Sequence, residues 1–583
     1  MLKPSNKPFV KLSGEGIRRG NRERETDARA PQAVRIFEGN RNNVHLSFPL
    51  FPKKFFSSLT YLIALGLTLC LDGVGQAQEK SIPQLKIIVN SDRDGSIQPD
   101  SALTLREAIL LANGTLSPER LSEAERALVE ESQNVSRIEF DLLPGQTTIS
   151  VLEELPPLAR EGLIVDGTTQ PGYDPTPLAP SNLPIPMPIV AIAPANDKEI
   201  LRGLTIVADN VTVKGLSIYG FASRHGRTAT TPPADIFIAH RLPPPDTSQQ
   251  QPPDWNFSFR ERDIPPQGVA IEANWLGILP DGSAPVMASA FGVSVFNSRG
   301  TTIRHNWIAH HDGSGIITSV RSQNLIIEEN LLENNGFEGM PDAIRLEGII
   351  DKTQVIGNEI HDNAGSAIYL FKPEGATQIR DNRIARNGKR FERAAIFLMG
   401  NGHELKNNKI QEQPGPGVVV AAYPQSRGNR IQDNQFSRLD GLSIDLVGQI
   451  DVSPQAYQKG DGVNPPHDSY QRRRKTGNFS IEAPRWLSPE LIISPVDGTV
   501  ELAGVAEPNS QVDIYRVTEE GGTHGPLNQR FKTVKTDDKG NFSLIVEVLK
   551  TGDRVSAIAT HPEYGTSEPA ENLLIRAIDR TDK

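Results

Sequence analysis

The chain of 583 residues is poor in several features that commonly stabilise or anchor proteins. It has one cysteine, Cys70, so no disulfide can form within one chain, and export of such proteins is common in bacteria. Outside residues 55–71, no apolar run is long enough to cross a membrane. An excess of positive charge is also missing. Residues 1–77 carry 12 Lys and Arg against 6 Asp and Glu, which leaves 49 against 65, a net charge of −16, in the remainder. This balance argues against nucleic acid as a partner.

Residues 53–77 have the organisation of a secretory signal peptide. Lys53 and Lys54 precede the apolar run 55–71, and Gly75-Gln76-Ala77 supplies small residues for cleavage. We interpret residues 1–52, which are basic and without pattern, as disordered or as an over-extended start of translation. The sequence therefore predicts an exported mature chain without cysteine and without a membrane span.

One phrase recurs six times between residues 303 and 436: aliphatic, two residues, asparagine, one residue, apolar. The steps between the asparagines are 24, 28, 24, 26 and 26 residues. A fixed period of this size is typical of a solenoid whose units bury their apolar faces only by stacking. The asparagines are Asn306, Asn330, Asn358, Asn382, Asn408 and Asn434.

A short apolar strand follows each asparagine after 10 or 14 residues, at Ile316, Ile344, Ile368, Ile396, Val418 and Ile444. Two strands per coil, and no room for a helix, predict a parallel β-helix over residues 161–450. The asparagines are expected to stack inside a turn, where each amide bonds its neighbours. The pattern extends backwards to Asn274 and, with Leu216 in the asparagine slot, to residue 213. The Pro- and Gln-rich segment 222–267 is interpreted as a long excursion from one coil.

The regions on either side of the solenoid have their own patterns. In the predicted cap region 78–160, Thr104 and Glu107 form a capping box before an apolar run, so a helix is expected to close one end of the solenoid. Residues 487–577 contain five strand-like runs separated by turn residues, as in a β-sandwich. Residues 451–486 are polar and are interpreted as a linker.

Several of these segments resemble one known family. Leu105-Arg106-Glu107-Ala108 resembles the motif that names the CSLREA-type secreted bacterial right-handed β-helix proteins, although Leu103 and Thr104 replace its Cys and Ser. Further similar phrases are Val165–Tyr173, Glu272–Gly277 with Asp281-Gly282, Gly441–Leu446, Asp461–Asn464 and His467-Asp468. The resemblance covers residues 85–577. It implies export and an all-β, right-handed parallel β-helix of the pectate-lyase-like superfold, followed by a module similar to bacterial immunoglobulin-like domains. The family has no shared catalytic set to carry over.

Three short clusters contain residue types that occur in catalytic or metal sites. His310-His311-Asp312 has residue types of a base or a metal site, but neighbours on a strand point to opposite faces, so a solvated turn is favoured. Pro466-His467-Asp468 is similar to an epimerase motif but lies beyond the last clear coil, and a plain loop is favoured. Asp92, Asp94 and Gly95 hint at a calcium loop, yet Ile97 and Pro99 stand where oxygen ligands are wanted. No catalytic set, metal site or cofactor is therefore predicted, and Ca²⁺ enters only if the protein is a lyase.

Two surface features predict binding. The first is a row of side chains that point outward from the second predicted strand of each coil. Arg345, Tyr369 and Phe397 occupy this position in three consecutive coils, so the two aromatic rings are expected to lie roughly 5 Å apart. Exposed aromatic rows suit sugar rings. The alternative is that the excursion or the linker covers this row. The second feature is a set of cations that could contact an acidic polysaccharide or simply form a solvated face: Arg380, Arg383, Lys406, Lys409, Lys389 and Arg390.

The sequence thus favours a monomeric binding or adhesion protein, secreted or at the surface or outer envelope of a bacterium, with polysaccharide as its partner. Two alternatives stay open because one fold hosts many functions. One is a polysaccharide lyase, hydrolase or C5-epimerase, and the other is a structural envelope protein.

Overall fold

A computed structural model describes residues 83–177, 180–222, 232–240, 264–422, 425–448, 458–470, 475–519 and 522–577. The predicted leader 1–52, the signal peptide 53–77 and most of the excursion 222–267 lie outside the described residues. No helix in the described ranges is long and apolar enough to cross a membrane.

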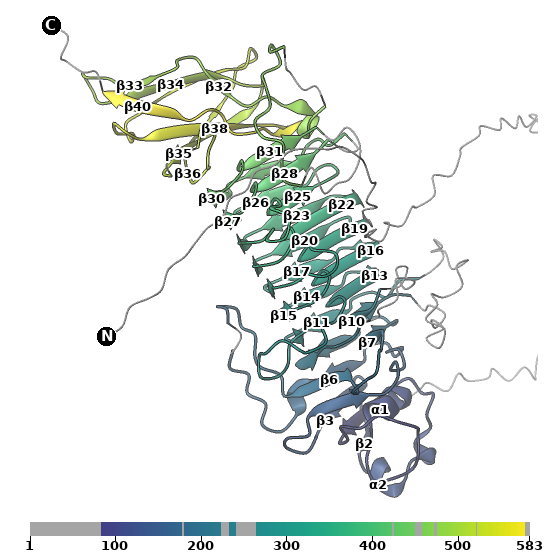
Figure 1. The fold of residues 1–583 in the computed structure, drawn as a ribbon. Coiled ribbons are helices and arrows are strands. Elements are labelled where there is room, and N and C mark those ends of the chain that lie inside the picture. The colour runs from purple at the N-terminus through teal and green to yellow at the C-terminus, as the bar shows by residue number, and fades with distance from the viewer. Residues whose placement is uncertain are drawn as a thin grey trace, which may run out of the picture. The chain divides into compact units, whose positions relative to one another are not determined.

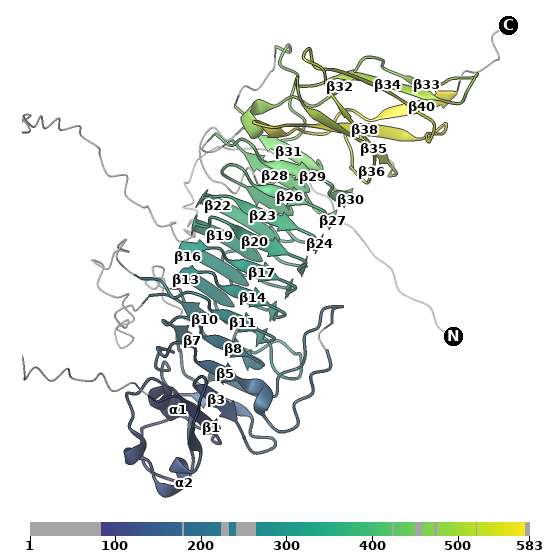
Figure 2. The same cartoon turned by 180° about the vertical axis from the view of Figure 1, so that it is seen from behind.

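The described coils form a parallel β-helix with three sheets, and each sheet is built from the strands that successive coils contribute (Figure 1, Figure 2). The first sheet contains β1 (Leu85–Val89), β2 (Val129–Glu131), β3 (Arg137–Phe140), β5 (Ile164–Asp166), β8 (Thr212–Lys214), β11 (Ala270–Glu272), β14 (Thr302–Arg304), β17 (Ile326–Glu328), β20 (Thr353–Ile356), β23 (Thr377–Arg380), β26 (Glu404–Lys406) and β29 (Arg430–Gln432). The second contains β4 (Thr148–Val151), β6 (Val190–Pro194), β9 (Leu216–Ile218), β12 (Trp275–Leu276), β15 (Trp307–Ala309), β18 (Leu331–Glu333), β21 (Glu359–His361), β24 (Arg383–Ala385), β27 (Lys409–Gln413) and β30 (Gln435–Leu439). The third contains β7 (Arg202–Ile206), β10 (Ala234–Ile238), β13 (Val293–Arg299), β16 (Ile316–Gln323), β19 (Ile344–Ile349), β22 (Ile368–Glu374), β25 (Ile396–Leu398), β28 (Val418–Ala421) and β31 (Ile444–Val447).

The prediction of two strands per coil is wrong, because each repeated phrase forms two short strands with the asparagine turn between them. Ile303 lies in β14 and Ile308 in β15, which belong to different sheets. The residue before the asparagine, His305, has φ +55°, and this left-handed residue bends the chain from one sheet to the next. Parallel pairing also begins earlier than residue 161, since β1 already pairs in parallel with β3.

The predicted register of the apolar residues is confirmed. Ile303 pairs with Ile327, which pairs in turn with Val355, and the same column continues through Ile379 and Leu405. Every member of this column is buried. β-branched and leucine side chains stacked at a spacing of about 5 Å fill the interior, so each coil supplies the surface on which the next one packs.

The asparagine ladder is also confirmed. The Asn330 amide nitrogen Nδ2 donates to Oδ1 of Asn358 at 3.0 Å and to the Ile303 carbonyl at 2.8 Å, while the Asn330 main-chain N–H donates to the same Oδ1 at 3.0 Å. This pattern joins Asn274 to Asn306 and continues to Asn434, and all these side chains are buried. The ladder supplies hydrogen-bond partners to the main-chain N–H and carbonyl groups of a turn that is buried inside the protein.

A second ladder in the next turn was not predicted. Asn335 donates to Asn363 at 3.0 Å, and Asn363 donates to Asn387 at 2.8 Å. His311 stands at the head of this ladder, with Nδ1 2.8 Å from Oδ1 of Asn335. Both turns that flank the second sheet are therefore held by stacked amides.

The N-terminal described region contains helix α1 (Leu105–Ala112), the short helices η1 (Pro118–Arg120) and α2 (Glu123–Arg126), and strands β1 to β4. The capping box of α1 is present, with Thr104 and Glu107 each accepting from the other's main chain. Leu105 and Ile109 of α1 are buried in the same cluster as the coil interior. Arg106 is a buried cation, paired with Asp94 at 2.7 Å.

The C-terminal module has two groups of strands. One contains β32 (Arg485–Trp486), β34 (Val500–Val505) and β37 (Asn541–Val546). The other contains β33 (Leu491–Ile493), β40 (Leu573–Ala577), β38 (Arg554–His561), β35 (Gln511–Val517), β36 (Gln529–Lys535) and β39 (Gly565–Thr566). Most of the pairings are antiparallel, and β34 to β38 cover the five predicted strand-like runs.

The module meets the last coil through main-chain hydrogen bonds. Thr566 N–H donates to the Asn429 carbonyl at 3.0 Å, beside β29, and Phe436 N–H in β30 donates to the Leu527 carbonyl at 3.1 Å. Tyr515, Leu527 and Ile558 of the module belong to the buried cluster of the coils. All three sheets therefore end against the module, because Leu446 of β31 also donates to it, at the Glu568 carboxylate.

Candidate functional site

The predicted aromatic row is stacked but not exposed. The Tyr369 and Phe397 rings have centroids 5.1 Å apart, yet they are only 1% and 0% exposed. They belong to a small buried cluster outside the coil interior, together with Met399 and Val419. The prediction of an exposed row is therefore wrong, although the two side chains do point away from the coil interior.

The linker covers at least part of this row. The Gln458 carbonyl accepts from the Ala394 main-chain N–H at 2.7 Å, and the Gln458 side chain bonds the Tyr369 hydroxyl. Burial raises the pKa of Tyr369 far above its usual value. This observation agrees with the alternative that the row is structural and carries a cover.

The third residue of the row, Arg345, is a structural cation. Its guanidinium lies over the Tyr369 ring at 4.6 Å, contacts Asp342 at 3.2 Å and also pairs with Glu347. Arg393 approaches the same Asp342 at 3.4 Å. Arg345 therefore lies inside a compensated network and is not available to an acidic polysaccharide.

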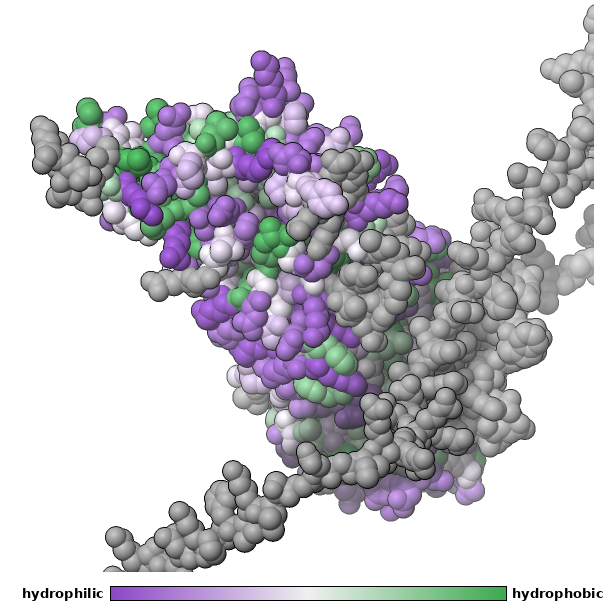
Figure 3. Space-filling model, turned by 45° about the horizontal axis from the view of Figure 1, so that its top comes forward, coloured by the Kyte–Doolittle hydropathy of each residue, from purple (hydrophilic) through white to green (hydrophobic). Residues whose placement is uncertain are grey.

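Most of the predicted cations on the coil face lie beside carboxylates. Arg383 pairs with Glu359 at 3.0 Å and Lys389 with Asp362 at 2.6 Å. Arg380 and Lys406 pair with Asp381 and Asp433 at 2.9 and 3.9 Å, while Arg390 donates to the Gly339 carbonyl at 3.5 Å and Lys409 is exposed. Hydrophilic residues are prominent over the described coils in Figure 3. Exposed pairs of this kind contribute little stability, and a binding role for these residues stays a prediction.

His311 differs from the prediction of a solvated turn, because its side chain is fully buried. Nε2 lies 2.9 Å from Oδ2 of Asp235, whose other oxygen accepts from the Ser289 hydroxyl. Burial raises the pKa of Asp235. His310, with φ +62°, is partly exposed and does not join this network. The network is enclosed, so it holds the turn and offers no reactive atom to solvent.

Asp94, one of the residues that suggested a calcium loop, has a structural role. The Asp94 carboxylate binds Arg106 through both oxygens and accepts from the Leu152 main-chain N–H at 2.9 Å. Its oxygens are therefore occupied by protein donors.

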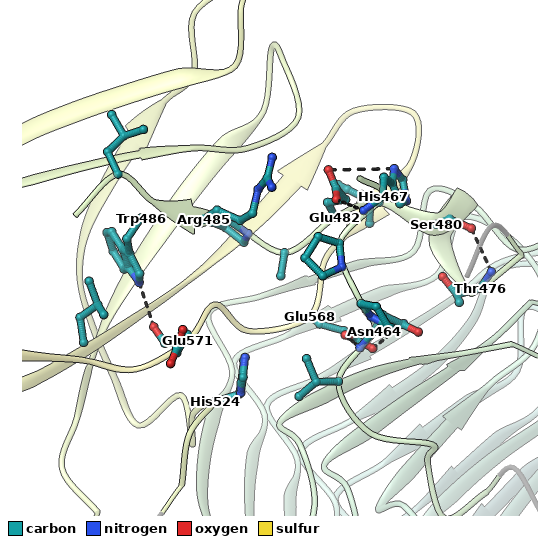
Figure 4. Close-up of a pocket in the computed structure, with 18 of the residues that line it drawn as sticks. Asn464, His467, Thr476, Ser480, Glu482, Arg485, Trp486, His524, Glu568 and Glu571 are labelled. Atoms are coloured by element: carbon teal, nitrogen blue, oxygen red, sulfur yellow. Dashed lines mark hydrogen bonds and ion pairs between the residues drawn. The ribbon is translucent and has the colours of Figure 1, made fainter. Parts of the chain in front are cut away.

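A hollow of functional interest lies where the linker meets the C-terminal module (Figure 4). We call it the junction cleft, and its volume is about 570 Å³. That volume suits a small ligand such as one or two sugar units. The cleft is lined by Val463, Asn464, Pro465, Pro466, His467, Thr476, Ser480, Ile481, Glu482, Ala483, Pro484, Arg485, Trp486, Leu487, Ser488, Pro489, His524, Glu568, Glu571 and Leu573.

One side of the junction cleft is apolar with a polar edge. Trp486 is partly exposed, and its Nε1 donates to the Glu571 carbonyl at 2.8 Å, which fixes the indole (Figure 4). The indole also contacts the Phe542 ring edge to face, with centroids 6.0 Å apart. Leu487, at 65% exposure, continues this apolar surface. A held aromatic ring with open space beside it is suited to the apolar face of a sugar.

Polar groups line the rest of the junction cleft. Figure 4 places His467 and Glu482 on the side opposite Trp486, with His524 between the two sides. Glu482 accepts from the His467 main-chain N–H at 2.5 Å. Burial lowers the pKa of His524, so its imidazole is neutral at pH 7 and has one donor and one acceptor nitrogen.

Two carboxyl groups beside the junction cleft are held by the protein itself. Glu568 accepts from the Leu446 and Asn464 main-chain N–H groups at 3.0 and 2.8 Å, and from Asn464 Nδ2 at 2.7 Å. The pKa of Glu568 is raised to about 8, mainly by burial and secondly by repulsion from Asp445. Burial also raises the pKa of Asp445, which accepts from the Gly462 main-chain N–H at 3.0 Å. These groups join the last coil, the linker and the module.

Sequence reasoning found only part of the junction cleft. The sequence predicts a plain loop at His467-Asp468, whereas in the structure His467 lines a hollow and Asp468 pairs with Arg485 at 2.9 Å. Trp486 was missed because it lies at the end of a segment interpreted as a linker. The available signal was that Trp486 is one of only four tryptophans and lies between Pro484 and Pro489.

Comparison with known proteins identifies the architecture of the coils. A family model described as periplasmic copper-binding protein (NosD) matches residues 265–392, and one described as right handed beta helix region matches residues 347–449. The coils are therefore those of a right-handed β-helix. No curated protein matches the chain.

Solved structures that resemble the chain do so at low identity. ORF18 of Geobacillus virus E2 is 12% identical with a TM-score of 0.40, and the match covers 84% of this chain and 75% of that one. The surface protein and adhesin PfbA of Streptococcus pneumoniae is 15% identical with a TM-score of 0.31, covering 53% and 86%. An alginate lyase from Paenibacillus sp. str. FPU-7 is 11% identical with a TM-score of 0.32, covering 52% and 91%. We draw no functional conclusion from likenesses of this size.

The copper named by the first family model does not fit the residues that the structure describes. In those ranges, no group of three or more His, Cys, Asp or Glu side chains is placed to hold a metal ion. Buried His403 uses Nδ1 to accept from Thr377 N–H at 3.2 Å and Nε2 to reach the Met399 carbonyl at 2.8 Å. No function is therefore derived through copper.

Proposed function

We propose that this protein is an exported glycan-binding protein of the adhesion type, and that the junction cleft holds the sugar. The observation that carries the proposal is the partly exposed, hydrogen-bonded indole of Trp486 beside a hollow of about 570 Å³. Sugar recognition needs an apolar platform together with groups that donate and accept hydrogen bonds. Trp486, His467, His524 and Glu482 supply these groups in one place.

The architecture supports a role outside the cytoplasm. A β-helix with closed ends is a rigid scaffold, and the proposed mature chain has no cysteine that must stay reduced. In this proposal the α1 region closes the N-terminal end, and an immunoglobulin-like sandwich closes the C-terminal end. The similarity to the CSLREA-type proteins and the expected signal peptide at 53–77 support the proposal that the protein works at the cell surface or in the outer envelope, and we propose that it does so as a monomer.

Binding is favoured over hydrolysis or elimination, because Glu568, the buried carboxyl group beside the junction cleft, already has protein partners. An acid–base mechanism needs a carboxyl group that can reach the substrate. Glu568 accepts three hydrogen bonds from Leu446 and Asn464, and these bonds fix its position in the joint. Polysaccharide lyase, hydrolase or epimerase activity is tested directly by looking for shortened, unsaturated or epimerised products.

The test is a glycan array of the full chain, followed by calorimetry with the best ligand. Trp486→Ala is expected to weaken binding at least tenfold, because the sugar loses its apolar platform, and His524→Ala is expected to weaken it less. Phe337→Ala is a matched control, because Phe337 is an aromatic residue on a coil loop at 41% exposure. It should leave affinity unchanged.

Thermal unfolding of each variant separates loss of binding from loss of folding. Unchanged affinity in folded Trp486→Ala and His524→Ala would exclude the junction cleft as the glycan site. Turnover of any array ligand by the wild-type protein would favour the enzymatic alternative.

A further inference from the structure

A second exposed aromatic group lies outside the junction cleft. The Phe479 and Tyr564 rings are stacked with centroids 5.1 Å apart, and the His561 ring stacks on Tyr564 at 4.1 Å. Phe479 is 57% exposed, although large apolar side chains are mostly buried in this protein. Phe479 comes from η4 (Asn478–Ser480), and the other two come from β38 and the turn before β39.

The backbone holds Phe479 outwards at a conformational cost. Asn478, Phe479 and Ser480 have φ values of +51°, +56° and +60°, which is the left-handed region that bulky residues avoid. Asn478 is buried, and its Nδ2 donates to the carbonyls of Asn429 and Thr566 at 3.0 and 2.8 Å. Phe479 N–H donates to the Ser426 carbonyl at 2.9 Å. The residues on both sides are therefore fixed inside while the ring between them stays in solvent.

Beside this ring lies a hollow of about 260 Å³ lined by Asn401, Gln425, Arg427 and Phe479. The Asn401, Gln425 and Arg427 side chains are exposed. Asn401 Oδ1 accepts from the Arg427 main-chain N–H at 2.9 Å, which joins the two turns that carry these residues. A shallow hollow with an aromatic wall, a cation and amides offers stacking and charge at one position.

Arg427 differs from the other coil arginines in its surroundings. Arg383, Arg386 and Arg430 each lie within 3.6 Å of a carboxylate oxygen. For Arg427, no ion pair is present among the residues that the structure describes. A guanidinium without a carboxylate partner, on a chain with an excess of acidic residues, is suited to an anion supplied by a ligand.

The His561 imidazole, which stacks on Tyr564 behind the Phe479 ring, is held in one orientation by main-chain N–H groups. The Glu563 and Tyr564 main-chain N–H groups point at His561 Nδ1 at 3.2 and 3.3 Å. In the neutral imidazole Nδ1 is therefore an acceptor, and the proton is on Nε2.

We infer that this hollow is a second carbohydrate site and that it selects an acidic sugar, a uronate. The pyranose lies against the Phe479 ring, the Arg427 guanidinium binds the sugar carboxylate with two hydrogen bonds, and Asn401 and Gln425 bond hydroxyl groups. The inference rests on the proposed glycan-binding function only in taking a sugar as the ligand. It assigns charge selectivity to a place separate from the junction cleft.

The test is calorimetry of the full chain with a galacturonate tetramer and with the matching neutral galactose tetramer. The acidic tetramer should bind at least tenfold more tightly at low salt, and raising the salt concentration should reduce this difference. Arg427→Gln should remove the preference while leaving the binding of the neutral tetramer unchanged. Arg427→Lys should keep part of the preference, because the charge stays and the paired hydrogen bonds are lost.

Phe479→Gly is the second variant, because glycine adopts a φ of +56° without strain and the protein should fold at least as well. It should weaken binding of the acidic tetramer about tenfold, which corresponds to about 1.4 kcal/mol. Glu404→Gln is the control, since Glu404 pairs with Arg430 on the first sheet at 3.6 Å.

The outcomes distinguish this inference from the proposed function. If Arg427→Gln and Phe479→Gly leave the affinity for the acidic tetramer within twofold of wild type while Trp486→Ala abolishes it, the sugar lies in the junction cleft and the second site is excluded. Equal affinity of the wild type for the two tetramers also overturns the inference. If no glycan of any kind binds, both proposals fail.

Discussion

The main-chain N–H of Leu446, in the last coil, donates a hydrogen bond of 3.0 Å to the carboxylate of Glu568, in the C-terminal module. Asp445 lies next to Leu446, and Glu568 also binds Asn464 of the linker. The joint between coils and module is therefore built on buried carboxyl groups. Its stability should depend on pH.

The free energy of unfolding should fall as the pH rises. Burial raises the pKa of Glu568 to about 8, and it raises the pKa of Asp445 as well. Unfolded carboxyl groups have pKa values of about 4, so the folded protein holds more protons above pH 4. The contribution is fully present below pH 4 and is lost as the pH rises through about 8. Melting temperatures measured between pH 5 and 9 check this expectation.

Glu568→Gln should reduce the decrease in melting temperature with rising pH, because the glutamine side chain cannot ionise. Glu563→Gln, at an exposed carboxylate in the same module, should leave the decline as it is. A melting temperature that rises from pH 6 to pH 8 in the wild type would contradict the assignment.

Loss of one amide in the middle of the asparagine ladder should be costly. Asn358 accepts two hydrogen bonds from Asn330 through Oδ1 and donates to the Ile327 carbonyl and to Asn382. Asn358→Ala leaves several buried polar groups without partners, each worth about 1–3 kcal/mol, so a loss of about 3 kcal/mol or more is expected. Chemical denaturation measures it. Gln378→Ala, at an exposed position of β23, should change stability by less than about 0.5 kcal/mol.

The buried aromatic pair should act on stability and not on binding. Phe397→Ala removes a fully buried ring that stacks on Tyr369, and it should lower the free energy of unfolding by about 3–5 kcal/mol. Phe397→Leu keeps most of the volume and should cost less. Glycan affinity measured well below the melting temperature should be unchanged in both. A folded Phe397→Ala protein with a specific loss of affinity would restore the aromatic row as a binding site.

Leu527 should couple the module to the last coil. Its side chain is fully buried in the coil cluster, and its carbonyl accepts from Phe436 of β30. Leu527→Ala should cost about 2–5 kcal/mol and should speed hydrogen exchange in β29 to β31. Leu574→Ala, at 38% exposure in the same module, is the matched control. Exchange rates in the coil that stay the same in Leu527→Ala would mean that the module is an independent unit.

The periodic part of the fold was predictable because its determinants repeat. Each coil needs the same inward apolar residues and the same turn amide, so Asn306 and its successors carry the register. The second ladder was predictable for the same reason. Asn335, Asn363 and Asn387 each follow a member of the first ladder by five residues, and His311 follows Asn306 by the same distance. That offset explains why His311 is buried.

The functional surface was less predictable, because it depends on contacts that do not repeat. Alternation along β22 indicates correctly that Tyr369 points away from the coil interior, but it does not say which segment packs outside. The partner, Gln458, lies in a polar stretch about ninety residues later. The junction cleft likewise combines residues 463–489 with residues 524–573, and no local pattern joins them.

The pairing of Thr566 with Asn429 also bears on how such a protein changes in size over evolution. Because the module occupies the hydrogen-bonding positions that another turn of the spiral would use, repeats cannot be appended behind β31. Lengthening must occur by duplication within the row of Asn-bearing units, where a copy finds matching surfaces above and below. The same obstruction prevents two molecules from joining end to end into a fibre through this terminus.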